Sequence, residues 1–122
     1  MKRTDAVSDP GASPRRDARR YPRYTLDMRV VVEVFRGPAV QSLWGRCNEI
    51  GQDGMSATLT GELQLGEVAT LQFTLPRTVA VTKMRALVRH RIGFRHGFEF
   101  LALTQAQQKA IQRAVEIAEQ QL

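Results

Sequence analysis

The sequence predicts a mainly β protein: an antiparallel barrel or sandwich with one C-terminal amphipathic helix and a flexible basic N-terminal arm. Three observations predict this fold. Short runs rich in β-branched and aromatic residues follow one another, turn-forming glycines and prolines separate them, and a helical period appears only after residue 104. The chain has 122 residues, 43% hydrophobic and 25% charged, which fits one globular domain with its own core.

The expected strands follow one another directly, which favours antiparallel pairing over a parallel α/β sheet. In the run that ends at Pro76, Ala69, Leu71, Phe73 and Leu75 alternate with more polar residues, so these four side chains are the expected core face. Ile92 and Gly93 are the expected turn of the last hairpin. The expected strands cover residues 28–35, 40–50, 55–60, 67–75, 78–91 and 94–101.

The C-terminal segment changes to a helical period. Thr104 is a good N-cap for a helix over residues 105–121. We expect this helix to pack on its own barrel, and packing against a partner protein is the alternative. One apolar face of the helix is formed by Ile111, Val115, Ala118 and Leu122.

The N-terminal segment differs from the rest in composition and charge. Residues 1–18 contain almost no large apolar side chains, so we expect a disordered basic arm there and a folded domain over residues 19–122. Residues 1–23 carry seven Lys or Arg and three Asp, whereas residues 24–122 carry eleven basic and nine acidic residues. A basic arm on a nearly balanced body indicates an anionic partner: a phosphate ligand, nucleic acid or an acidic surface.

Catalytic and metal-binding chemistry is not expected. Cys47 is the single cysteine, has no histidine near it in sequence, and is expected to be simply buried. His90 and His96 have arginine neighbours that oppose a metal ion, so we expect solvated histidines and no metal site. No enzyme activity or cofactor is predicted. Without a signal peptide or an apolar run of membrane-spanning length, we expect no membrane insertion and a cytoplasmic location.

The basic cluster at residues 15–23 contains arginine and no lysine. Planar guanidinium groups suit phosphate oxygens and the acceptor edge of guanine, so this usage favours specific recognition over a merely charged tail. A charged tail without a specific ligand remains the alternative. The arginines of the cluster are Arg15, Arg16, Arg19, Arg20 and Arg23.

Three segments together resemble the PilZ domain family. Residues 19–23 resemble its R-x-x-x-R motif, residues 46–57 its second motif, D/N-x-S-x-x-G, and residues 89–101 its closing hairpin. The resemblance spans about residues 19–120. It implies a six- or seven-stranded barrel that binds the bacterial second messenger cyclic di-GMP.

The resemblance also implies which residues bind the ligand. Arg19 and Arg23 match the two motif arginines and would engage guanine and phosphate, and Arg20 is an auxiliary candidate. Gly54 matches the final glycine of the second motif, where a purely structural role would be to supply positive φ in the turn.

The second motif departs from the family pattern at two positions. Glu49 stands where Asp or Asn is expected, and Gly51 stands where Ser is expected, which removes a hydroxyl and leaves the Gly51 N–H as a group that could still face the ligand. Asn48 is one residue out of register, so strand alternation places it on the opposite face unless the chain contains a bulge there. Two imperfect contacts would weaken binding about ten- to a hundredfold.

Three functions follow from these observations. The first is a cyclic di-GMP receptor whose arm closes over the dinucleotide and signals to a downstream protein partner. The second is a protein-interaction module that keeps the fold but does not bind nucleotide, which the changes at Glu49 and Gly51 would allow. The third, a nonspecific nucleic-acid binder, is less favoured, because few aromatic side chains are placed to stack on bases.

Overall fold

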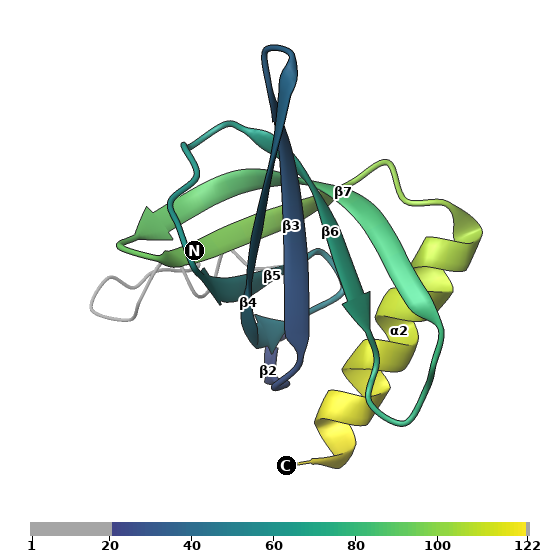
Figure 1. The fold of residues 1–122 in the computed structure, drawn as a ribbon. Helices are drawn as coiled ribbons and strands as arrows, with labels where there is room; N and C mark the ends of the chain where they lie inside the picture. The colour runs from purple at the N-terminus through teal and green to yellow at the C-terminus, as the bar shows by residue number, and fades with distance from the viewer. Residues whose placement is uncertain (1–20, 122) are drawn as a thin grey trace, which may run out of the picture.

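The computed structural model describes residues 21–121, which form an antiparallel β-barrel with one helix packed against it (Figure 1). The helix α2 spans Gln105–Gln120. Within residues 21–121, no helix is long and apolar enough to cross a membrane. The strands are β2 (Tyr24–Thr25), β3 (Arg29–Arg36), β4 (Ala39–Ile50), β5 (Gly54–Leu59), β6 (Val68–Thr74), β7 (Val81–Ile92) and β8 (Arg95–Leu101).

Six strands close the barrel and one lies outside it. The neighbours run β4-β3-β6-β7-β8-β5, and β5 pairs again with β4, so the sheet has no free edge along this circuit. The short strand β2 pairs antiparallel with the end of β4, with Tyr24 opposite Ile50. A closed barrel, one of the two predicted architectures, is therefore confirmed.

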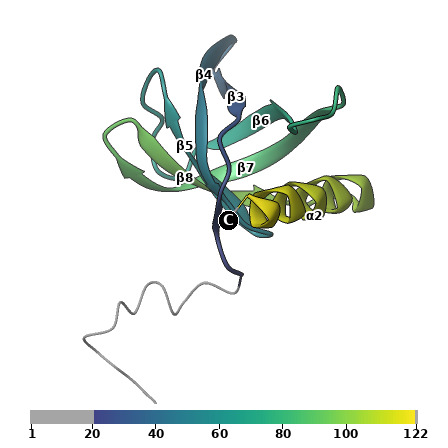
Figure 2. The same ribbon diagram turned by 90° about the horizontal axis from the view of Figure 1, so that it is seen from below.

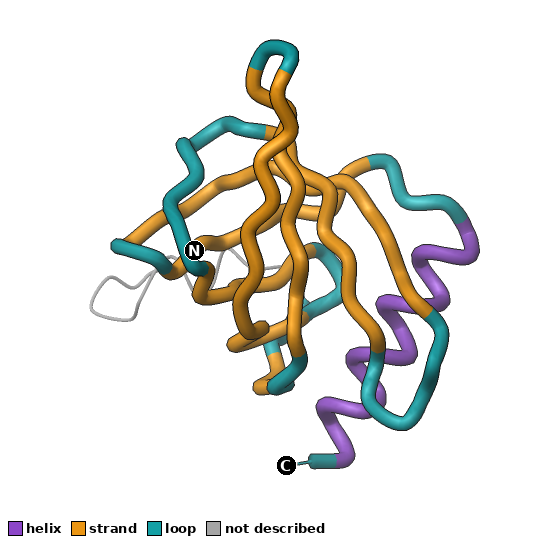
Figure 3. The backbone as a smooth tube through the Cα atoms, in the orientation of Figure 1, coloured by secondary structure: helices purple, strands orange, loops and turns teal. Residues whose placement is uncertain are grey.

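Strand alternation fills the interior of the barrel. In β3 the valines Val30, Val32 and Val34 are buried, and the residues between them face outward or lie half-exposed. The same alternation in β6 buries the predicted core face of Ala69, Leu71 and Phe73, and Leu75 is buried just beyond the strand. The hairpin between β3 and β4 extends beyond the body of the barrel (Figure 3).

The last hairpin turns one residue later than the sequence predicts. Its two turn residues are Gly93 and Phe94, while Ile92 remains in β7 and pairs with Arg95. Gly93 has a φ of +59°, a left-handed conformation that glycine adopts without steric cost. The turn therefore begins at the glycine, because Ile92 would be strained in that position.

Helix α2 begins at the predicted cap. Thr104 accepts a hydrogen bond from the Gln107 N–H, and the Gln107 side chain accepts one from the Thr104 N–H, which completes a capping box. The helix contacts β2, β4 and β7 of its own barrel, as predicted, and lies along one side of it (Figure 2). Leu122 lies outside the described residues. The buried face consists of Ile111, Ala114, Val115, Ile117 and Ala118.

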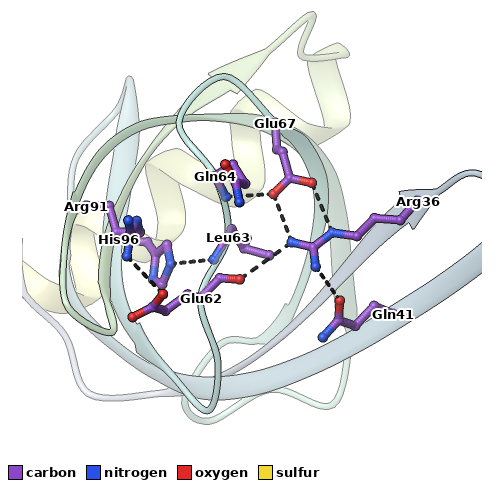
Figure 4. A network of polar contacts seen from close by, with 8 residues as sticks. All are labelled: Arg36, Gln41, Glu62, Leu63, Gln64, Glu67, Arg91 and His96. Carbon is purple, nitrogen blue, oxygen red and sulfur yellow. Dashed lines mark hydrogen bonds and ion pairs between the residues drawn. The ribbon is translucent and has the colours of Figure 1, made fainter.

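His96 is completely buried, so the expectation of a solvated histidine is wrong at this position, while His90 is exposed. The His96 Nε2 accepts a hydrogen bond from the Leu63 N–H at 2.9 Å (Figure 4). Its Nδ1 donates to the Phe94 carbonyl at 2.8 Å. The neutral ring satisfies both partners. Burial, the largest influence, lowers the pKa of His96.

The loop from β5 to β6, which His96 holds, is also tied to the neighbouring hairpin. Arg36 donates two hydrogen bonds to Glu67, at 3.1 and 2.9 Å, and a third to Gln41 at 2.6 Å (Figure 4). On the other side of the loop, Arg91 lies 3.2 Å from a Glu62 carboxylate oxygen. These contacts fix the loop across one end of the barrel.

We expect the protein to lose stability in mild acid through His96. A lowered folded-state pKa means that the unfolded chain binds the proton more readily, so the stabilisation is complete above about pH 6.5 and is lost as the pH falls through the folded pKa. Urea unfolding between pH 7.5 and 5 measures this change. His96→Gln keeps an acceptor and a donor without titrating, and should flatten the pH dependence, whereas His90→Gln should leave it unchanged.

Candidate functional site

The site begins with Arg23, which precedes β2 and lies over the turn between β4 and β5. A Cβ atom added to Gly51 would lie 2.8 Å from Arg23 Cδ, and one added to Gly54 would lie 3.3 Å from Arg23 Nη2. The Arg23 side chain is 16% exposed. The absence of side chains at these two glycines thus lets the guanidinium group lie directly against the turn.

An acidic residue of the same turn accompanies Arg23. Arg23 Nε and Asp53 Oδ1 are 3.5 Å apart, which makes an ion pair without a well-formed hydrogen bond. Both atoms are buried, and neither has a hydrogen-bond partner in the described part of the chain. A buried polar atom without a partner is energetically costly, so this pair marks a place where the site's polar groups are not fully satisfied.

The turn itself is closed by its two glycines. The Gly51 N–H donates to the Gly54 carbonyl at 2.9 Å, so in this structure the group is engaged within the turn. Gly54 does not have positive φ, which corrects the structural role predicted for it. A Cβ there would lie 2.1 Å from the Phe98 carbonyl oxygen, so Gly54 allows β5 to approach β8.

A β-bulge changes the face on which Asn48 lies. The register between β4 and β5 shifts between Cys47 and Glu49. Cys47 and Ile50 are both buried, while Asn48 and Glu49 between them are both half-exposed, so the two lie together on the outer surface. The strand therefore contains the bulge that keeps Asn48 on the same outer surface as Glu49.

Cys47 lies beneath this surface as a core residue. Its thiol donates to the Glu49 carbonyl at 3.4 Å, and burial raises its pKa to about 12. A thiol with this pKa is protonated at neutral pH, which makes it a poor nucleophile and a poor metal ligand. Within residues 21–121, no group of three or more His, Cys, Asp or Glu side chains is arranged to hold a metal ion.

Of the predicted ligand residues, the structure brings together Arg23, Gly51 and Gly54, and places Glu49 on the adjoining outer surface opposite Ser56. Arg19 and Arg20 lie outside the described residues. The sequence interpretation missed Asp53, although it stands within the second motif beside Gly54.

Comparison with known proteins decides the family. A family profile described as the PilZ domain matches residues 16–116. The chain belongs to the PilZ family. No curated protein matches the sequence.

Solved PilZ domains have the same fold. The PilZ domain of YcgR from Escherichia coli, solved with c-di-GMP, has a TM-score of 0.69 at 20% identity, over 85% of this chain and 93% of that one. The PilZ domain of CeSA from a cellulose-synthesizing bacterium has a TM-score of 0.64 at 15% identity, over 80% and 98% of the two chains. YcgR itself, also in complex with c-di-GMP, matches with a TM-score of 0.66 at 24% identity, over 85% of this chain and 47% of the other.

We expect Gly54→Ala to destabilise the PilZ domain. The added Cβ would meet backbone at 2.1 Å, so the β5–β8 pair must separate locally, at a cost of about 1–3 kcal/mol. Gly61→Ala is the matched control, because its Cβ would first meet the flexible end of Leu43 at 3.0 Å. Urea unfolding of both variants tests the difference; equal free energies of unfolding would contradict the role assigned to Gly54.

Proposed function

We propose that this PilZ domain is a receptor for cyclic di-GMP. The observation that carries the proposal is the placement of Arg23 directly over the Gly51–Gly54 turn, which joins residues of both motifs in one site. A guanidinium group offers paired donors to phosphate oxygens and to guanine. The structures of the E. coli YcgR PilZ domain, which contain c-di-GMP on the same fold, support this ligand class.

In this mechanism the arm closes over the dinucleotide. Arg19 and Arg20, which directly follow the arm, would join Arg23, while Glu49 and Gly54 belong to the barrel side of the site. Residues 1–18 would be disordered without ligand, separate from the folded domain of residues 19–122. Ordering of the arm on the ligand would create a surface for a downstream protein partner in the cytoplasm. The domain binds its ligand without converting it, so no catalytic residue or cofactor is assigned.

The second candidate is a protein-interaction module that has lost the nucleotide. The hydrogen bond within the turn favours it, because the Gly51 N–H is already donated to Gly54 and Gly51 has no hydroxyl. The second motif then offers the ligand fewer groups than the family pattern does. In that case, partner proteins captured by the domain would not change with cyclic di-GMP or with substitution of Arg19 and Arg23.

We expect Arg23→Ala to weaken cyclic di-GMP binding at least about tenfold. A hydrogen bond to a charged group is worth about 1.5–3 kcal/mol, and each ~1.4 kcal/mol is a factor of ten in affinity. Titration calorimetry of the two proteins measures the loss directly. Arg113→Ala is the matched control, because Arg113 is an exposed arginine of α2 and its loss should leave the affinity unchanged.

The wild-type titration decides between the two candidates. Heat that saturates with cyclic di-GMP and is lost in Arg23→Ala supports the receptor. An absence of heat for the wild type at high micromolar ligand would rule the receptor out and favour the interaction module.

A further inference from the structure

The outer surface of β4, β5 and β8 carries polar side chains that do not occupy the named positions of either motif. The bulge in β4 places Asn48 on this surface, next to Glu49. Thr58 of β5 lies opposite Arg46 of β4 on one side and opposite Arg95 of β8 on the other. Asn48, Thr58 and Arg95 thus follow one another across three adjacent strands.

The side chain of Asn48 is held in one orientation. The Thr58 hydroxyl donates to Asn48 Oδ1 at 3.1 Å, and the Asn48 main-chain carbonyl accepts from the Leu26 N–H at 3.4 Å. Because its oxygen is engaged by Thr58, the Asn48 side chain has its NH₂ group left to donate. The bulge and Thr58 together therefore present a hydrogen-bond donor on the outer surface.

The two arginines that flank Thr58 differ in their partners. Arg46 donates to Asp27 at 2.9 Å, so its charge is already compensated. Arg95 lies 3.4 Å from the Ser56 hydroxyl through Nη2 and, across residues 21–121, makes no ion pair with a carboxylate. Arg95 is exposed, so most of its donors are available to a ligand.

We infer that Asn48 and Arg95, with Thr58 holding Asn48, form a surface that recognises a guanine base of the ligand. The inference rests on the proposed function and adds to it the residues that select the base. Asn48 and Arg95 both present donors, which match the two acceptors, O6 and N7, on one edge of guanine. Adenine carries an amino group in place of O6, so the same donors would meet a donor. The surface therefore selects guanine over adenine.

The selection can be measured with two cyclic dinucleotides. Titration calorimetry of the full chain with cyclic di-GMP and with cyclic di-AMP gives an affinity ratio for each variant. We expect Arg95→Ala and Asn48→Ala to weaken cyclic di-GMP binding at least about fivefold and to reduce the ratio by a similar factor. Arg46→Ala is the matched control, since Arg46 also flanks Thr58 but is paired with Asp27. Arg46→Ala should change neither the cyclic di-GMP affinity nor the affinity ratio by more than about twofold.

A purely structural role for Asn48 is tested by a second variant. Thr58→Val keeps the shape of the threonine and removes the hydroxyl that holds Asn48. We expect it to lower the affinity ratio, while its thermal unfolding temperature remains close to that of the wild type. If Asn48→Ala fails to fold, Thr58→Val and Arg95→Ala decide the inference.

The outcomes separate this inference from the proposed function. If the wild type binds cyclic di-GMP and Arg23→Ala weakens it, but the Arg95 and Asn48 variants keep the wild-type ratio, the base-selecting surface is overturned and the receptor stands. Equal weakening for both dinucleotides would also overturn it, because that result indicates charge attraction without base selection. If the wild type binds neither dinucleotide, the receptor and the surface both fail.

Discussion

The structure depends on the pairing of β4 with strands on both of its sides. Its first part, from Ala39, pairs with β3, and its last part, to Ile50, pairs with β5 and with the short strand β2. The β4–β5 pairing is the one that turns a curved sheet into a closed barrel, because it joins the two ends of the strand order. A strand shared in this way must bend, and the bulge between Cys47 and Glu49 lies in the section that closes the barrel.

Close backbone approach at this closure requires glycine on both sides of β5. A Cβ at Gly45 would lie 1.9 Å from the Thr58 carbonyl oxygen. A Cβ at Gly54 would lie 2.1 Å from the Phe98 carbonyl oxygen. The turn between β4 and β5 contacts the segment that precedes β2: a Cβ at Gly51 would lie 2.7 Å from the Pro22 carbonyl oxygen as well as against Arg23. The candidate site therefore lies where the barrel closes. The glycines there have no side chains, so the segment with Pro22 and Arg23 can lie directly against the backbone.

Much of this fold could be predicted from the sequence because it depends on local rules. Alternation in β6 identified its core face, and Thr104 marked the start of α2 through a capping box. The burial of His96 could not be predicted in this way, because a distant segment decides it. His96 is buried because its ring meets the Leu63 N–H of the β5–β6 loop, 33 positions away in sequence. The bulge at Asn48 lies in the part of β4 that pairs with β5, and no glycine or proline marks it in the sequence.

The altered second motif should accordingly be interpreted by geometry, not by position in the sequence alone. Glu49 and Gly51 are counted from Gly54, which assumes regular alternation, but the bulge places two consecutive residues on the outer surface. The side-chain amide of Asn48 therefore lies beside Glu49, although Asn48 does not occupy the Asp or Asn position of the motif. The core beneath that surface consists of apolar side chains such as Cys47, Met55 and Ala57, which do not depend on it. The retained fold therefore does not by itself fix the ligand, and we infer that the donors on the outer surface do.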